Sequence, residues 1–399
     1  MENGENELIG TAAHTRNILK RNVILFYAIY ILFNALIVFK YGTRQHYINA
    51  WLLSMIYVIF LVFVLIINVK IKLKENVYKY LFFGLGALFF IFAIWLNTHV
   101  DKYGLKVDRW SAMEVCIKSL INDIYPYSAI DHLQGRSSNL PALIFIGMPF
   151  YLLGDVGYLQ CFTFLLMLVL IYIYFKTYRV RVWALLTIVF STAYCYDIYV
   201  KSDIVSNFIL TLVFVVLSEQ RFRKDKKADI VFNAVGSALL IMTRIVTVIP
   251  LILLLFRRFL KMSTKAKWQF MVVFFLIITV TCAVVFKNVG SMDNFMNYNP
   301  FYLQNSQLPF LLSLFCILIP FLFSFYIKNT EVLIKYCIIF LLLPVLLSLV
   351  AKTIEFDGLY NSILGSRFDI SYFNFVNPFL IFYLAILFDK LAHYPGKHT

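Results

Sequence analysis

The amino-acid sequence predicts an all-α polytopic membrane protein. Of its 399 residues, 61% are hydrophobic and only 14% are charged, and the mean hydropathy is +0.80. A soluble domain would be nearly half apolar and about a quarter charged. Apolar runs of roughly 17 to 25 residues recur along the chain, and each is long enough to cross the hydrocarbon core of a bilayer. Because these runs are continuous rather than alternating, they predict helices and not the strands of a barrel.

We expect about ten full spans, a half-length helix hairpin and interface helices in the first large outer loop. The ten runs lie near 22–39, 51–69, 80–96, 157–175, 182–198, 203–218, 268–286, 308–326, 333–350 and 373–389. The shorter apolar segment 140–153, which begins at Pro141, predicts a surface or re-entrant helix. The first twenty residues are polar without a cleavable signal pattern, so we expect the first span to direct membrane insertion.

The distribution of charge predicts the orientation of these spans. With the N-terminus in the cytoplasm, the inner segments hold 24 of the 36 Lys and Arg residues and the outer segments hold 11, with Arg244 between them. Acids run the other way, with 9 inside and 12 outside. This agrees with the positive-inside rule and places both termini in the cytoplasm. The net charge of +15 is therefore explained mostly by topology, and we expect no nucleic-acid partner.

The segment 229–256 lies between two strongly basic loops, so a single crossing would place one of those loops outside. We expect instead a hairpin of two half-length helices with its turn at 242–244 and with Pro250 breaking the second leg. Arg244 would then lie deep in the protein, where a charge is costly unless it is paired or hydrated. It is a candidate site residue, and the alternative is a structural arginine bound to carbonyl groups and one acid.

The longest outer segment, 97–156, carries five acids before residue 137. Apolar residues at 110, 113, 117, 120 and 121 form one face of a helix, which we expect to lie in the interface plane with Trp110 as its anchor. Asp108 stands at the start of this helix and Glu114 lies within it. The alternative interpretation of Asp108 is a simple N-cap, worth about 1 kcal/mol.

Two further outer segments carry charge. The short turn in "YDIYVKSDIVSN" holds Asp197, Lys201 and Asp203, which is more charge than a turn requires. The alternative is a solvated helix end with Asp203 as N-cap. In "LGSRFDISYFNFVNPF", Gly365 lets the backbone approach a ligand, and Arg367 offers a planar fork suited to phosphate. The alternative for this arginine is contact with lipid headgroups.

Together these segments predict a site of acids and bases on the outer membrane face. A carboxylate there can deprotonate an incoming hydroxyl, and a guanidinium can hold a phosphate leaving group. An outward-facing site has no access to cytosolic nucleotide sugars. We therefore expect the activated substrate to be a lipid-linked phosphate.

At this point the motifs resemble those of the GT-C superfamily of membrane glycosyltransferases, which includes protein O-mannosyltransferases and the lipid A aminoarabinose transferase. The segment "VDRWSAMEVCIKSLINDIYPY" is similar to the family's first outer loop, with Asp108 as the essential acid. "SSNLPALIFIGMPFYLLG" is similar to its short Pro-containing helix, and "YVKSDIVSN" supplies the second acid, Asp203.

Later motifs continue the resemblance, which covers roughly residues 80 to 390. "VGSALLIMTRIVTVIPLILLLF", with Gly236 and Arg244, looks like the family's hairpin, and "GSRFDISYFNFVNPFL", with Arg367 and Pro378, looks like its late Arg segment. Three features depart from the family pattern. Two spans precede the catalytic loop, "DRW" replaces an Asp-Glu or Asp-x-Asp motif, and the C-terminal part has no large outer domain.

The resemblance implies an inverting sugar transfer from a polyprenyl-phosphate donor to a glycan or lipid acceptor. In that interpretation Asp108 is the general base. The acceptor or a metal is positioned by Asp203, Glu114 and Asp197, and the donor phosphate is bound by Arg244, Arg367 and Lys201. No resident cofactor is implied, and dependence on a divalent cation stays open because of the "DRW" sequence.

The resemblance also implies the domain organisation and location. Residues 1–79 would form an N-terminal tail and two leading spans, 80–390 the catalytic core, and 391–399 a short cytoplasmic tail. We expect an integral protein of a bacterial cytoplasmic membrane, acting on the cell envelope with its site outside and in contact with membrane lipids.

Two alternatives remain. A polysaccharide polymerase or ligase also uses lipid-linked donors, although such proteins usually carry their long outer loop late in the chain. A transporter or lipid flippase would often show broken helices at matching positions in two halves. The sequence shows one such broken segment, 229–256, and no matching partner.

Overall fold

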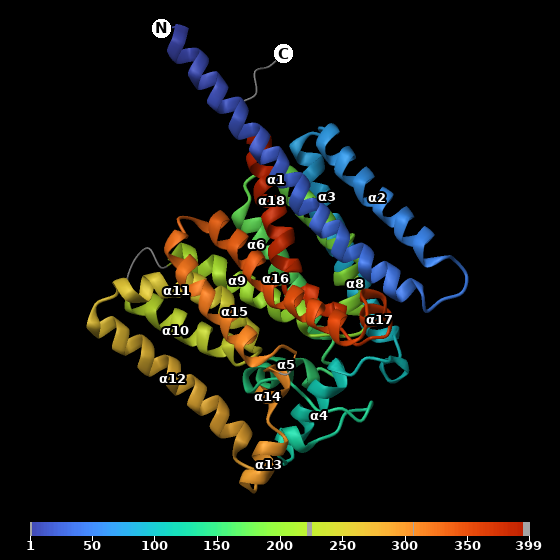
Figure 1. Ribbon diagram of the computed structural model, residues 1–399, viewed down its shortest axis with the longest axis vertical. Helices are drawn as coiled ribbons and strands as arrows, with labels where there is room; N and C mark the ends of the chain where they lie inside the picture. The colour runs from blue at the N-terminus through green and yellow to red at the C-terminus, as the bar shows by residue number, and fades with distance from the viewer. Residues whose placement is uncertain (1, 222–225, 306, 394–399) are drawn as a thin grey trace. The chain divides into compact units, whose positions relative to one another are not determined.

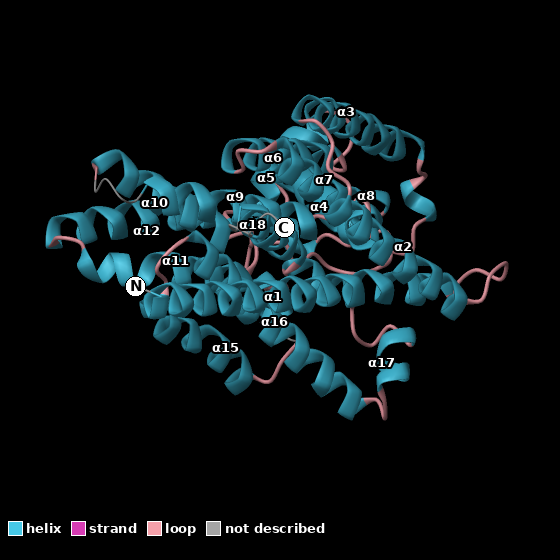
Figure 2. Cartoon of the chain, turned by 90° about the horizontal axis from the view of Figure 1, so that it is seen from above, coloured by secondary structure: helices cyan, strands magenta, loops and turns pink. Residues whose placement is uncertain are grey.

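The computed structural model describes residues 2–221, 226–305 and 307–393, and every regular element within these residues is a helix (Figures 1 and 2). The chain forms two compact units, which do not follow chain order. The first comprises residues 1–89, 168–195 and 377–399, and the second comprises 90–167 and 196–376.

The first unit is built around long apolar helices. They are α1 (Glu2–Gly42), α2 (Ala50–Lys70), most of α3 (Glu75–His99), the end of α6 (Tyr158–Tyr174), α7 (Tyr178–Val189), the start of α8 (Thr192–Tyr199) and α18 (Asn377–His393). Helix α1 packs against α2 and α18, and α18 packs against α7. The Tyr27 hydroxyl donates to the Leu61 carbonyl at 2.8 Å, which fixes α1 against α2 inside an apolar environment.

The run predicted as one straight span over 182–198 is bent by 57° where α7 ends and α8 begins. The break leaves backbone groups without helical partners, and Asn34 of α1 compensates for this. Its Oδ1 accepts hydrogen bonds from the Ala193 N–H at 3.0 Å and the Ser191 hydroxyl at 2.8 Å. A buried break in a helix is stable only where such partners exist.

The second unit contains the other helices. They are α4 (Arg109–Ile121), α5 (Pro141–Leu152), α9 (Ile204–Arg221), α10 (Lys227–Ile241), α11 (Val248–Lys261), α12 (Thr264–Phe286), α13 (Met292–Asn297), α14 (Pro300–Asn305), α15 (Phe310–Phe323), α16 (Thr330–Glu355) and α17 (Leu359–Leu364). Short 3-10 turns join them: η1 (Lys102–Gly104), η2 (Pro126–Ser128), η4 (Ile245–Thr247), η5 (Ser324–Tyr326) and η6 (Ile370–Phe375). Helices α10 and α12 lie side by side along one edge of this unit (Figure 1).

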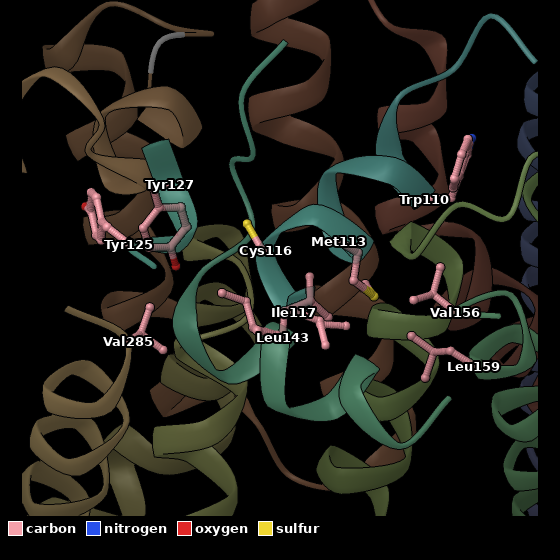
Figure 3. Close-up of a cluster of buried hydrophobic side chains, with 11 residues drawn as sticks. Trp110, Met113, Cys116, Ile117, Tyr125, Tyr127, Leu143, Val156, Leu159 and Val285 are labelled. Atoms are coloured by element: carbon pink, nitrogen blue, oxygen red, sulfur yellow. The ribbon is translucent and has the colours of Figure 1, made fainter. Parts of the chain in front are cut away.

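Helix α4 forms where the amphipathic pattern predicted it, but its apolar face packs on protein. Figure 3 shows Met113 and Ile117 of α4 pointing toward Leu143 of α5, and all three are buried. Trp110 belongs to the same buried cluster with 2% exposure, so its expected role as an interface anchor is wrong. An apolar helix face is satisfied equally by lipid and by another helix, and here α5 supplies the partner.

The hairpin predicted over 229–256 is confirmed as two short helices, α10 and α11, joined through 242–247. Their 15 and 14 residues correspond to about 21–23 Å each, which is too short for a complete crossing. Pro250 does not break the second leg. It lies in the first turn of α11, where the missing N–H would have no helical acceptor in any case.

Six helices of the described residues are long and apolar enough to cross a membrane. They cover 17–42, 50–70, 75–99, 204–221, 264–286 and 330–355, and two bent pairs raise the number to eight. The predicted runs at 157–175 and 373–389 also form helices, but each has only 17 residues. The protein is therefore an all-helical chain with six to eight candidate spans, and the larger number expected from the sequence stays a prediction.

Candidate functional site

An elongated cleft in the second unit, with about 880 Å³ of space including its open part, is the candidate site. Its lining comes from the hairpin turn and from α11, α14, α15, α16 and η6. The polar lining residues are Ser138, Arg244, Gln304, Asn305, Gln307, Ser313, Ser348 and Tyr372, and the apolar ones include Ile249, Leu303, Leu308, Ile317, Pro344, Val345 and Phe375. A guanidinium therefore lies on the wall of a mostly apolar cleft.

Arg244 is held by a buried ion pair with Asp203. Its Nη2 and Nε lie 2.5 and 3.1 Å from the same oxygen, Oδ2, and the side chains are 7% and 2% exposed. The other oxygen of Asp203 is buried and accepts no hydrogen bond from any described residue. The expectation that Arg244 lies deep in the protein is confirmed, and its pairing with one acid agrees with part of the alternative, a structural arginine. The alternative of Asp203 as the N-cap of α9 is wrong, because its carboxylate is bound to Arg244.

Asp197 performs that cap instead. Its Oδ2 accepts the Val205 N–H in the first turn of α9 at 2.8 Å, and its Oδ1 accepts from the Asn374 amide at 3.1 Å. The side chain is almost completely buried. Asp197 thus joins the start of α9 to the late segment η6, and its predicted role in positioning the acceptor stays a prediction.

Arg109, which the sequence analysis did not single out, connects the first loop to the late segment. Its Nη2 donates to the Asp369 carboxylate and to the Ser371 hydroxyl, the latter at 2.9 Å. Burial lowers the pKa of Arg109, but nearby acidic groups, first of all the carboxylate of Asp369 and also those of Asp203 and Asp197, outweigh that effect and raise it. Residues of the 97–156 loop, of the α8–α9 region and of the late segment therefore act on one guanidinium.

Asp108 lies at the N-cap position of α4, yet its side chain makes no capping hydrogen bond. No described residue donates a hydrogen bond to its half-buried carboxylate. One of its oxygens lies 3.4 Å from the place that a Cβ on Gly135 would occupy, which is an ordinary contact distance. The N-cap alternative is therefore wrong for Asp108, and its carboxylate is left available.

Tyr372, which lines the cleft, is affected by charges from several of the predicted segments. Burial raises the pKa of this lining tyrosine, and the negative charges of Asp369 and Asp108 raise it further, while Arg109 and Arg244 lower it. Two acids and two arginines therefore act on a single phenol. These charges come from the 97–156 loop, the hairpin turn and the late segment, and Asp203 of the α8–α9 turn is bound to one of them, Arg244.

Three predicted site residues remain to be placed: Glu114, Lys201 and Arg367. Glu114 is bound to Lys102 at 2.5 Å, and the ammonium of Lys201 is bound to Asp155 and to the Asn97 carbonyl. Arg367 is exposed, with its guanidinium 5.1 Å from the centre of the Phe356 ring. The predicted roles of these three side chains are not tested by their placement.

Within the described residues, no three His, Cys, Asp or Glu side chains are grouped to hold a metal ion. Comparison with known proteins found no family model, no curated protein and no solved structure that matches the chain. The residues that the sequence analysis missed are Arg109, Asp369 and Tyr372. They stand next to or inside the quoted motifs, but only the fold reveals which distant partner each one meets.

Proposed function

We propose that this chain is an inverting glycosyltransferase that moves a sugar from a polyprenyl-phosphate donor to a hydroxyl of a glycan or lipid acceptor at the outer membrane face. One observation carries the proposal. A carboxylate without a hydrogen-bond donor, Asp108, contributes to the charge that acts on the phenol of Tyr372, and this phenol lines the same mostly apolar cleft as Arg244. The resemblance of the motifs to GT-C enzymes is in agreement with it.

In this proposal the apolar wall of the cleft receives the polyprenyl chain. Arg244 binds the phosphate, since Asp203 occupies its Nε and Nη2 and no described residue accepts from its Nη1. A guanidinium suits phosphate because its planar nitrogens match two oxygens at once. Tyr372 can donate a further hydrogen bond, because its raised pKa keeps the phenol protonated at neutral pH.

The reaction is then a single displacement at the anomeric carbon. The acceptor hydroxyl attacks the anomeric carbon from the face opposite the phosphate, and its proton passes to the Asp108 carboxylate. The bond between the anomeric carbon and the phosphate oxygen breaks, so that polyprenyl phosphate leaves with the negative charge. Arg244 stabilises that charge as it develops, which is a large source of rate in reactions of this kind.

The test is Asp108→Asn in the purified full-length protein, assayed with polyprenyl-phosphate sugars. We expect transfer to fall by about 10²–10⁴-fold, as for the loss of a general base. Thermal stability should stay unchanged, because the Asp108 side chain makes no capping bond. Asp293→Asn, at an exposed position of α13, is the matched control. Retained transfer in Asp108→Asn would exclude this residue as the base.

The products of the same assay separate the alternatives. A single added sugar supports the transferase, whereas a ladder of lengths would indicate a polymerase. Movement of a lipid-linked sugar across proteoliposomes without any new glycosidic bond would indicate a transporter.

A further inference from the structure

We propose that Asp155 is a positioning residue that fixes the turn before Asp203 relative to the helix that starts after Asp108. The inference rests on the proposed function and adds to it a second ionic cluster in the same unit, separate from the cleft. This cluster joins α4 to the α8–α9 turn through one carboxylate.

Asp155 accepts two hydrogen bonds and forms an ion pair with a second lysine. Its Oδ2 lies 2.6 Å from the Lys201 ammonium and 3.6 Å from that of Lys102, while its Oδ1 accepts the Gly157 N–H at 2.8 Å. The Lys201 side chain is only 2% exposed, and the Asp155 side chain is 15% exposed. A charge as buried as that of Lys201 requires a nearby counter-charge, and Asp155 supplies it.

On one side the cluster reaches α4. Lys102 is bound to Glu114 of α4 at 2.5 Å, and its ammonium lies 4.8 Å from the centre of the Trp110 ring. Burial lowers the pKa of Lys102, but its hydrogen bond with Glu114 and the charge of Asp155 outweigh that effect and raise the pKa. Lys102 therefore remains charged and holds the first turns of the helix that Asp108 precedes.

On the other side the cluster reaches the turn. Lys201 has φ = +53°, a left-handed conformation that is costly for a lysine and that persists only where the surroundings enforce it. Gln160 and Thr163 of α6 reinforce the same attachment by donating to the Ser202 carbonyl at 2.5 Å and to the Ser206 hydroxyl at 3.0 Å. Asp203 directly follows this fixed turn.

This arrangement gives Lys201 a different role from the one that the resemblance implied. Its ammonium is occupied by Asp155 and by the Asn97 carbonyl at 2.9 Å, so binding a phosphate would require both contacts to break. Glu114 is likewise occupied, because it binds Lys102, which connects α4 to Asp155. In the proposed reaction these side chains set the distance between two acids and do not contact the substrate.

The test compares Asp155→Asn with the double variant Asp155→Asn/Lys201→Met in the full-length protein. The single variant leaves the Lys201 charge without its counter-ion. It should transfer sugar about 10²-fold more slowly, as expected for a misplaced reacting group, with polyprenyl-phosphate affinity unchanged within about threefold. The double variant removes both charges and should regain thermal stability but not the rate. Asp155→Glu should keep more of the rate than Asp155→Asn.

Hydrogen exchange provides a readout that does not depend on activity. Asp155→Asn should speed amide exchange in both 109–121 and 199–206, whereas Asp123→Asn, which breaks the exposed ion pair with Lys287, should do so in neither. Full recovery of the rate in the double variant would overturn the inference, as would exchange that changes only near residue 155. Failure of the proposed function can be told apart from failure of this inference. In the first case the unmodified protein would transfer no sugar, while Asp155→Asn would still speed amide exchange in both segments.

Discussion

Removing the Arg244 side chain tests how strongly the buried ion pair stabilises the second unit. Arg244→Met leaves the Asp203 carboxylate with 2% exposure and without its counter-charge. One oxygen of this carboxylate already accepts no hydrogen bond from the described residues, and the substitution removes both donors from the other. Breaking a buried pair in this way costs about 3–5 kcal/mol, because the remaining charge stays desolvated.

For a unit of this size, that cost corresponds to a fall in Tm of roughly 6–20 °C. The assay is thermal unfolding of the purified protein in detergent, followed by intrinsic fluorescence. The matched control is Lys287→Met, which breaks the Asp123–Lys287 pair at 72% and 50% exposure. A pair so exposed contributes about 0–1 kcal/mol, so the control should shift Tm only slightly.

A double variant distinguishes the effect of an uncompensated charge from the effect of lost side-chain packing. Asp203→Asn/Arg244→Met removes both charges and should recover most of the lost Tm, since no uncompensated ion remains. The reasoning is refuted if Arg244→Met lowers Tm no more than Lys287→Met. It is also refuted if the double variant is less stable than Arg244→Met, because the loss would then come from packing and not from the isolated carboxylate.

Three further predictions follow from other parts of the structure. Gly236→Ala should destabilise the protein by about 1–3 kcal/mol in chemical unfolding, since its Cβ would lie 2.1 Å from the Phe214 ring, whereas Gly84→Ala, where nothing lies within 4 Å, should not. Desolvation raises the pKa of Asp369, whose side chain is still 41% exposed, but the charge of Arg109 and the hydrogen bonds from Ser371 outweigh it and lower the pKa. The pair therefore stabilises the fold above the ordinary value of 3.8, and this contribution is lost as the pH falls through the lower folded value. The Tm difference between the parent and Asp369→Asn should therefore shrink in acid, and a difference that grows below pH 3.8 would contradict this sign. A cysteine placed at exposed position 72 should react with an impermeant thiol reagent only from the inside, and one placed at exposed position 103 only from the outside. Labelling of both cysteines from the same side would refute the predicted orientation.

The sequence predicted the positions of the helices well, because run length and continuity are local properties. All ten predicted apolar runs form helices, and the short elements at 109–121 and 141–152 lie where the patterns indicated them. It predicted the surroundings of those helices less well. The apolar face that carries Trp110 could pack on lipid or on protein, and only the fold shows that it packs on α5.

The pairing of charges could not be predicted for the same reason. Arg109 and Asp369 are separated by 260 positions, and nothing in either local sequence indicates the other. Asp197 in α8 and Asp203 just before α9 are only six positions apart, and sequence position alone does not show that one caps α9 while the other binds Arg244. Long-range partners come from packing, which a single sequence does not display.

The predicted site residues differ in whether their charged groups have partners within the protein, and this difference indicates their roles. Lys201, Glu114 and Asp197 have partners within the protein that occupy their charged or polar atoms, so a substrate would have to displace those partners. Asp108 accepts no capping bond, and Arg244 keeps one nitrogen without a partner among the described residues. A buried or half-buried charge without a full set of partners is costly, so its retention is best explained by a ligand that completes the set. On this reasoning, Asp108→Asn should impair transfer more than stability. Changes at Arg244, whose Nε and Nη2 bind the buried Asp203, and changes at Lys201 and Glu114 should lower both together.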